Sequence, residues 1–288
     1  MAARTTALGG DDRVFLRRED EHELGAFKWR GAVAVLAQRR PELVVTASTG
    51  NHGAATAWAA RRAGVRAVVF VPEQASATKV ALIEAQGAEL RVAGADLDEA
   101  KEAARAYAGE HGGLFFEDGA EPAQFEGYEA IGRELLDDVP RPAAVVVPVG
   151  NGALAIGVFR ALEARSPETL RVAVAAEAAP AMWESWRAGR PVDSDRCSTF
   201  ADGLAVRVAI PLAAAELNRL AQRFELVSER ELEDAVRAYA AAGIRVEGAA
   251  AAPLALLRRE ELPRPVVLIV TGRNVDDALY DRILTNET

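Results

Sequence analysis

Short apolar runs alternate along the chain with longer segments in which apolar and polar positions recur with a helical period. A short apolar run predicts a buried strand, and apolar positions three and four residues apart predict a helix with one packed face. Gly64 and Gly87 end two of the helical segments, where glycine commonly closes a helix. The predicted strands span residues 13–18, 43–47, 67–71, 89–92, 114–117, 143–147, 172–176, 224–227 and 266–270.

Predicted helices connect these strands, and an alternation of strands and helices is typical of βαβ units in a parallel sheet. The helices span residues 28–38, 54–63, 78–86, 97–109, 128–136, 182–188, 212–223, 229–242, 249–259 and 275–284, with one more starting at residue 153. The polar segment Asp137–Pro142 interrupts the alternation and marks a boundary. We therefore predict an α/β protein of two open, three-layer, parallel-sheet domains. Residues 1–40 and 138–288 form the large domain, and residues 41–137 form the small one.

Composition limits the partners and the compartment. The sequence has 34 basic and 43 acidic residues, a net charge of −9, and no long basic run, so we expect neither nucleic acid nor an anionic membrane as a partner. Cys197 is the only cysteine in the sequence and fits a reducing compartment. The start lacks an apolar signal core, and no apolar run reaches membrane-spanning length. We therefore expect a cytoplasmic protein.

Lys28 lies in an apolar segment, with Ala26, Phe27 and Trp29 around it. Apolar surroundings disfavour the ammonium form and lower the pKa of a lysine, and a lysine that loses its proton near neutral pH can form a Schiff base. The same pattern also fits a lysine at a helix start whose head group reaches solvent. This segment by itself leaves both interpretations open.

Short polar residues gather in the segment Thr46–Gly53, between a predicted strand and a predicted helix. Ser48, Thr49 and Asn51 offer polar side chains, and the helix start offers backbone N–H groups, so the segment can bind an anion such as a carboxylate. A plain helix cap made by Ser48 or Thr49 would give the same pattern. His52, taken alone, is more often structural than catalytic.

The segment Pro148–Leu154 also joins a strand to a helix. Gly150 and Gly152 allow a close approach of the backbone, and Asn151 tolerates left-handed geometry. Backbone N–H groups at such a turn form a phosphate cradle, although a tight turn alone would also use these residues.

A rival interpretation uses the same turn. Gly150, Gly152 and Ala155 have the spacing of a dinucleotide-binding fingerprint, and Glu177 ends the next strand, where such folds hold the ribose. This pattern would indicate an NAD-dependent oxidoreductase or a nucleotide-binding module. It explains neither Lys28 nor the polar segment before Gly53.

A third polar turn, Val270–Asn274, follows the last predicted strand. Thr271 can offer its hydroxyl group to a ligand above the sheet edge. It can equally cap the last helix.

Together these segments resemble the fold-type II family of pyridoxal-phosphate enzymes, within it the branch of threonine and serine dehydratases and serine racemases. The matching segments, in the family's order, are Gly25–Ala32, similar to Ser-Phe-Lys-x-Arg-Gly-Ala; Ser48–Gly53, similar to Ser-x-Gly-Asn-His; Gly150–Leu154, similar to the tetraglycine loop; and Thr271–Asn274, similar to Ser-Gly-Gly-Asn. The segments Thr199–Ala205 and Glu247–Ala250 also have counterparts. The resemblance covers nearly the whole chain.

Some positions depart from the family pattern. Asn151 and Ala153 replace two glycines of the phosphate loop. Thr49 stands where racemases similar to this family carry the serine that acts as a second base, which argues against racemisation. The family's cation site would begin at Glu177, but its downstream aspartate falls on Trp183, so we expect no metal.

The resemblance implies pyridoxal phosphate as the cofactor, in the cleft between a large cofactor-binding domain and a small substrate-binding domain. It makes Lys28 the catalytic residue, which forms the Schiff base and then removes the α-proton. The cofactor-binding residues that it implies are Lys28, Phe27, Asn51, Gly150, Asn151, Gly152, Ala153, Leu154 and Thr271. The implied substrate-binding residues are Ser48, Thr49, Gly50, Asn51 and His52.

The resemblance also implies the reaction, a β-elimination from a hydroxy amino acid such as threonine or serine to a 2-oxo acid and ammonia. Thr271 at the ring nitrogen, with no carboxylate, would leave that nitrogen neutral and favour elimination over a long-lived carbanion. β-Replacement and racemisation remain alternatives on the same scaffold. Glu126 and Tyr128 could set the side-chain preference, and the family's habit suggests a homodimer.

Overall fold

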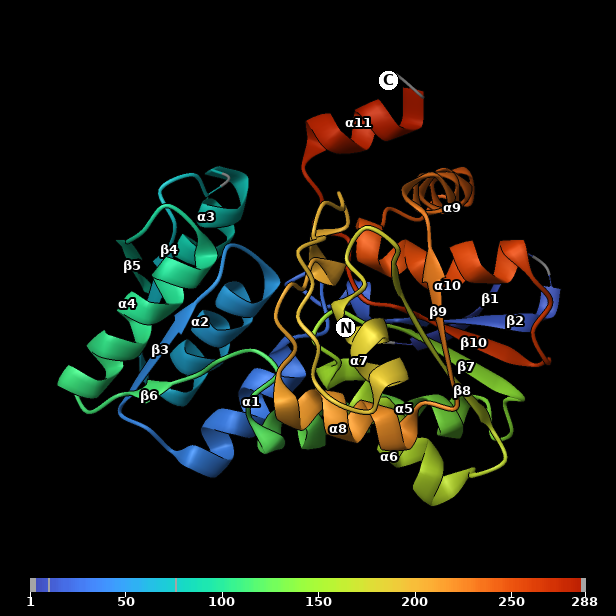
Figure 1. Cartoon of the computed structure of the whole chain (residues 1–288), viewed down its shortest axis with the longest axis horizontal. Coiled ribbons are helices and arrows are strands. Elements are labelled where there is room, and N and C mark those ends of the chain that lie inside the picture. Colours follow the sequence, from blue (N-terminus) through green and yellow to red (C-terminus); the bar gives the residue numbers. More distant parts are fainter. Residues whose placement is uncertain (1–3, 10, 76, 286–288) are drawn as a thin grey trace. The chain divides into compact units, whose positions relative to one another are not determined.

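The computed structural model describes residues 4–9, 11–75 and 77–285 (Figure 1). The chain divides into two compact units. Unit 1 comprises Met1–Phe27 and Tyr128–Thr288, and unit 2 comprises Lys28–Gly127. No helix among the described residues is long and apolar enough to cross a membrane.

The described part of unit 1 holds a six-stranded sheet in the order β1-β2-β10-β7-β8-β9. Its strands are β1 (Arg4–Leu8), β2 (Asp11–Arg18), β7 (Ala144–Pro148), β8 (Leu170–Ala176), β9 (Arg223–Val227) and β10 (Val266–Val270). β2 pairs in parallel with β10, so the N-terminal segment completes this sheet, as the sequence predicted. The other pairs are parallel except for β1 with β2.

Helices cover both faces of this sheet. They are the C-terminal part of α5 (Pro122–Asp138), α6 (Ala153–Arg165), α7 (Ala181–Ala188), α8 (Pro211–Leu220), α9 (Glu229–Ala241), α10 (Gly248–Arg259) and α11 (Asp277–Thr285), with the short turns η1 (Glu19–Glu21) and η2 (Asp202–Leu204). Figure 1 shows α9 and α10 on one face and α5 and α6 on the other. A strand covered on both faces has to be apolar throughout, which explains the short apolar runs in the sequence.

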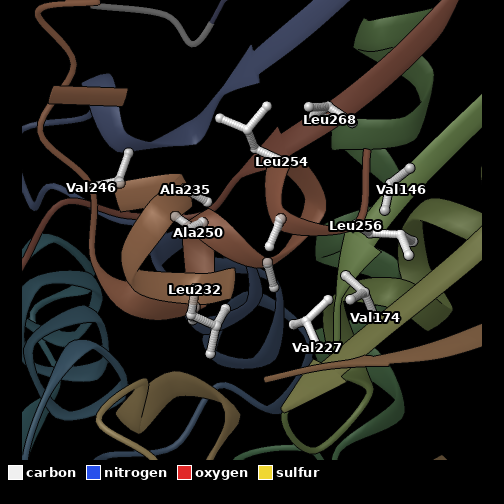
Figure 2. Close-up of a cluster of buried hydrophobic side chains, with 14 of the residues drawn as sticks. Val146, Val174, Val227, Leu232, Ala235, Val246, Ala250, Leu254, Leu256 and Leu268 are labelled. Atoms are coloured by element: carbon white, nitrogen blue, oxygen red, sulfur yellow. The ribbon is translucent and has the colours of Figure 1, made fainter. Parts of the chain in front are cut away.

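The main core of unit 1 lies between the sheet and helices α9 and α10 (Figure 2). Val146, Val174 and Leu268 reach it from three neighbouring strands, and Leu232 and Leu256 reach it from the helices. Successive strand residues point to opposite faces, so the neighbours of these valines and of Leu268 pack under the other helix layer.

Unit 2 contains a four-stranded parallel sheet in the order β5-β4-β3-β6. Its elements are α1 (Trp29–Arg39), β3 (Leu43–Ala47), α2 (Asn51–Ala63), β4 (Arg66–Val71), α3 (Ala77–Glu84), β5 (Glu89–Val92), α4 (Leu97–Glu110) and β6 (Leu114–Phe115), followed by the start of α5. One apolar cluster joins the sheet to α4, and a second joins it to α2 and α3. The three-layer α/β class that the sequence predicted is confirmed.

Two details differ from the prediction. Strand β1 was not predicted, because Arg4–Leu8 has no apolar run and forms its strand by pairing with β2 through a turn in which Gly9 has a φ of +56°. The boundary between the units also lies earlier than the predicted residues 40 and 137. Helix α1 packs against α2, in part through the Trp29 and Trp58 rings, whose centroids are 5.9 Å apart, so it belongs to unit 2.

A buried ion pair anchors the end of β2. The Arg17 side chain is 1% exposed and donates from Nε to Glu19, which is 0% exposed, at 2.9 Å. Arg17 also contacts Glu134 and Asp138 on α5. Removing one partner of a buried pair leaves an uncompensated charge in the interior, which is costly.

We expect Arg17→Met to lower the free energy of unfolding by about 3 to 5 kcal/mol, because Glu19 then stays buried without its cation. Arg13→Met is the matched control on the same strand, since Arg13 is 65% exposed and its pairing with Asp11 is a surface one. The control should change stability by less than about 1 kcal/mol. Denaturant unfolding of both variants measures this, and equal effects would contradict the role given to Arg17.

Candidate active site

The segment before Lys28 is held to the turn that follows β10. The Phe27 N–H donates to the Thr271 carbonyl at 3.1 Å, and the Arg273 N–H donates to the Gly25 carbonyl at 2.9 Å. Gly25 has a φ of +67°, and a Cβ there would lie 2.5 Å from Oδ1 of Asn274. Only glycine fits this position, so the chain reaches Phe27 along a defined path.

Lys28 immediately precedes α1, and its Nζ donates to Oδ2 of Asp118 at 2.5 Å. The other oxygen of Asp118 accepts from Gln124 Nε2 at 2.6 Å, and Gln124 accepts from the Gly119 N–H at 2.7 Å. Burial on its own would raise the pKa of Asp118. The Lys28 ammonium and the hydrogen bonds from Lys28 and Gln124 outweigh burial and hold this pKa well below its usual range.

This ion pair changes the interpretation of Lys28. Ala26 and Phe27 are buried, as the apolar pattern predicted, but the Lys28 side chain is 18% exposed and faces a carboxylate that is 24% exposed. Asp118 is not among the site residues that the sequence predicted. The signal was present, because Asp118 follows a predicted strand and ligand residues gather at the carboxyl ends of parallel strands.

The polar segment after β3 begins its helix earlier than predicted. Helix α2 starts at Asn51, so Asn51 and His52 lie in its first turn. The residue before the helix, Gly50, receives no side-chain cap, and its own N–H donates to Ser48 Oγ at 3.2 Å. Neither Ser48 nor Thr49 therefore caps α2, and the first-turn N–H groups keep the character of an anion site.

His52 is buried and joins this helix start to the turn that carries Asp118. Its Nε2 bonds to the Phe116 carbonyl at 3.2 Å, and a carbonyl only accepts, so Nε2 carries the proton. Its Nδ1 lies 3.7 Å from Oδ1 of Asp118. Burial lowers the pKa of His52, and the attraction of Asp118 offsets this only in part. His52 is therefore a neutral anchor at neutral pH.

In unit 1 the glycine turn follows β7. Gly152 precedes α6 with a φ of +95°, and the Ala153 N–H donates to Asn151 Oδ1 at 3.0 Å. A Cβ on Gly150 would lie 2.3 Å from the Gly203 carbonyl oxygen, so Gly150 is needed for this close approach. The helix start is built as an anion cradle, with one of its amides bonded to Asn151.

Thr271 follows β10, the sheet neighbour of β7, so its turn lies at the same sheet edge as the glycine turn. Its hydroxyl donates to Oε1 of Glu247 at 3.4 Å, and both residues are buried. Thr271 therefore has a carboxylate, Glu247, as a hydrogen-bond partner. Glu247 closely approaches the turn, since a Cβ on Gly272 would lie 2.6 Å from its Oε1.

The two residues suggested for side-chain preference have different surroundings. Tyr128 is fully buried on α5, with its ring centroid 5.0 Å from that of Phe27. Glu126 is exposed on the same helix. The rival ribose carboxylate, Glu177, is exposed directly after β8.

Within each unit the structure brings the predicted residues together in one neighbourhood. In unit 2 these are Lys28, Ser48, Thr49, Gly50, Asn51 and His52, joined by the unpredicted Asp118 and Gln124. In unit 1 they are Phe27, Gly150, Asn151, Gly152, Ala153, Leu154 and Thr271, joined by Glu247. Each neighbourhood lies at the carboxyl ends of parallel strands and combines an anion-binding helix start with a polar side chain.

These features are a lysine paired with a carboxylate and two helix starts that follow parallel strands in an α/β fold. The sequence matches the family model described as pyridoxal-phosphate-dependent enzyme over residues 2–272. The chain therefore belongs to the family of pyridoxal-phosphate-dependent enzymes. This assignment establishes the cofactor and replaces the dinucleotide interpretation of the Gly150 turn.

Similar proteins show which branch of this family the chain resembles. The chain is 32% identical over 283 residues to an L-threonine ammonia-lyase of Thermotoga maritima, covering 96% of this chain and 70% of that enzyme. It covers 41% of a biosynthetic L-threonine dehydratase of Pasteurella multocida, at 34% identity. Among solved structures, the processed threonine deaminase isoform 2 of Solanum lycopersicum matches with a TM-score of 0.89 and 25% identity, covering 95% of this chain and 83% of that chain. Maize serine racemase matches with a TM-score of 0.87 and 26% identity, and the match covers 95% of this chain and 87% of that chain.

The lowered pKa of His52 predicts a pH dependence of stability. Between that pKa and the ordinary value of about 6.5, the unfolded chain binds the proton that folded His52 rejects, so stability falls as pH is lowered through this window. The loss is about 1.4 kcal/mol for each unit by which the pKa is lowered. His52→Gln, which keeps an N–H donor for the Phe116 carbonyl, should show a shallower pH dependence.

Unfolding free energies measured from pH 8 to pH 5 test this expectation. The control is His111→Gln, because His111 is exposed and should leave the dependence unchanged. A wild-type curve with the same slope as that of the His52 variant would show that His52 does not titrate in this way.

Proposed function

We propose that this protein is a pyridoxal-phosphate-dependent ammonia-lyase that removes the β-hydroxyl group of a hydroxy amino acid such as threonine or serine. The products are a 2-oxo acid and ammonia. The observation that carries the proposal is that Lys28 Nζ lies 2.5 Å from an ionised carboxylate, next to the helix start that holds His52. The likeness to the Thermotoga maritima L-threonine ammonia-lyase over 96% of this chain supports the reaction.

The donor set of the chain fits the cofactor. Lys28 would hold it covalently, with Phe27 packed nearby, and the Gly150–Leu154 turn, including Asn151, Gly152 and Ala153, would hold its phosphate. Asn51 would bond the ring hydroxyl oxygen, and Thr271 would face the ring nitrogen. When bound, pyridoxal phosphate supplies the electron sink for negative charge that develops at the substrate Cα.

The side chains of unit 2 would divide the remaining work. The Ser48–His52 segment, with Thr49, Gly50 and Asn51, would bind the substrate carboxylate through the first-turn N–H groups of α2. Lys28 Nζ would accept the proton from Cα as the general base. Asp118 would then stabilise the resulting ammonium group, since its oxygen is already within hydrogen-bond distance of Nζ.

Racemisation is the second candidate, favoured by the likeness to maize serine racemase at a TM-score of 0.87. Thr49 at the position of the racemases' second base argues against it. Following the optical rotation of L-serine separates racemisation from elimination, and supplying a thiol detects β-replacement.

We also propose that unit 1, Met1–Phe27 and Tyr128–Thr288, provides most of the cofactor-binding residues and that unit 2, Lys28–Gly127, provides the substrate-binding residues. The net charge of −9 and the single cysteine support a cytoplasmic protein. A homodimer is the expected assembly, and measuring the mass in solution tests it.

Lys28→Ala should abolish turnover of L-threonine and L-serine, by at least about four orders of magnitude, because both the cofactor link and the base are lost. The protein should stay folded but show no cofactor absorption band that borohydride removes. Lys101→Ala is the control, as a second lysine of unit 2 that is 35% exposed. Turnover by Lys28→Ala at the wild-type rate would refute the mechanism.

Gly150→Ala should weaken the binding of pyridoxal phosphate at least about tenfold, or about 1.4 kcal/mol, because the new Cβ meets the Gly203 carbonyl at 2.3 Å and displaces the turn. Absorption titration of the cofactor-free protein measures the dissociation constant. Gly109→Ala, where a Cβ meets nothing within 4 Å, is the control. An unchanged dissociation constant for Gly150→Ala would remove this turn from the cofactor site.

A further inference from the structure

The position of Asp118 next to Lys28 suggests a role beyond stabilising the ammonium group of that lysine. It lies in the turn after β6, and its Oδ2 is 2.5 Å from Nζ of the lysine that would remove the α-proton. A base approaches the atom that it deprotonates to about 3 to 3.5 Å. A carboxylate 2.5 Å from Nζ therefore lies within about 6 Å of the substrate Cα, a distance that a group on the β-carbon can span.

The orientation of Asp118 is fixed by neutral groups. Gln124 is fully buried, donates to Oδ1 of Asp118 at 2.6 Å, and is itself held by the Gly119 N–H at 2.7 Å. This chain of hydrogen bonds keeps the carboxylate aimed at Lys28 without neutralising its charge. While Lys28 is an ammonium group, it holds the pKa of Asp118 well below its usual range, so the carboxylate is ionised at neutral pH.

In the part of the chain that the structure describes, few positive charges lie near Asp118 to offset its negative charge. Among the described residues, Lys28 and His52 are the basic groups within ion-pair distance of Asp118. Burial lowers the pKa of His52, so this residue brings no positive charge at neutral pH. When Lys28 is engaged with the cofactor or acts as a neutral base, it no longer offsets the charge of Asp118, and the hydrogen bond from Gln124 is a contact that still favours the carboxylate form.

We infer that Asp118 determines substrate specificity by side-chain charge: it excludes amino acids that carry a second carboxylate and admits those whose β-carbon bears an uncharged group. Like charges brought together in a poorly solvated site repel strongly, whereas an uncharged β-hydroxyl group can donate a hydrogen bond to the carboxylate. The inference rests on the proposed function and names the substrate class of that site. It places 3-hydroxyaspartate outside the class and serine and threonine within it.

The test compares L-serine with 3-hydroxyaspartate, which lose the same β-hydroxyl group and differ in the second carboxylate. We expect wild-type kcat/KM to favour serine by about a hundredfold. In Asp118→Asn this preference should fall at least about tenfold, mainly through KM for 3-hydroxyaspartate. Glu117→Gln is the matched control, because it removes one carboxylate from the adjacent residue, whose partners are Lys101 and Arg105.

A binding measurement keeps the test decisive if Asp118→Asn turns over slowly. L-Alanine and L-aspartate lack the β-hydroxyl group, so their dissociation constants follow from the shift of the cofactor absorption band without elimination. The wild type should bind alanine at least about tenfold more tightly than aspartate, and Asp118→Asn should lose most of this difference.

A wild-type protein that carries the cofactor band but binds alanine and aspartate equally overturns the inference and leaves the proposed function standing. An unchanged preference in Asp118→Asn, or an equal loss of preference in Glu117→Gln, overturns it as well. A protein that forms no cofactor band overturns the proposed function together with the inference.

Discussion

Parallel pairing of strands that are covered on both faces is the constraint on which the candidate site depends, because it brings the carboxyl ends of neighbouring strands to one edge. In unit 2, β3 pairs with β6, so the helix start that holds His52 and the turn that holds Asp118 begin side by side. In unit 1, β10 pairs with β7, and the Thr271 and Gly150 turns share an edge in the same way. The polar residues of each unit therefore come from different turns, and in both units a buried parallel sheet positions these turns.

Electrostatics gives the turns of unit 2 distinct roles. The ion pair and the Gln124 hydrogen bond keep Asp118 charged in spite of its burial, whereas burial keeps His52 neutral. His52 then acts through its N–H, which bonds to the Phe116 carbonyl and ties two turns together. The neutral His52 ring thus lies beside the charged carboxylate, with its Nδ1 3.7 Å from Oδ1 of Asp118.

The family assignment and the residue-level geometry answer different questions. Membership in the pyridoxal-phosphate-dependent family identifies the cofactor, since the match runs over residues 2–272. It does not explain why Asp118 faces Lys28 or why Glu247 lies beside Thr271. Asp118 and Glu247 lie beside the predicted residues. Contacts of this kind distinguish between substrates that undergo the same type of reaction.

The sequence by itself determined most of the secondary structure and the motifs, because buried strands are continuous apolar runs and because polar turns follow them. Strands β3, β5 and β10 have the predicted bounds, and the local setting of Lys28 left two interpretations open until the other motifs were considered with it. Only the tertiary structure decided the partner of Lys28, which lies 90 residues away at Asp118. That partner depends on the strand order β5-β4-β3-β6, and local periodicity carries no information about which strands become neighbours.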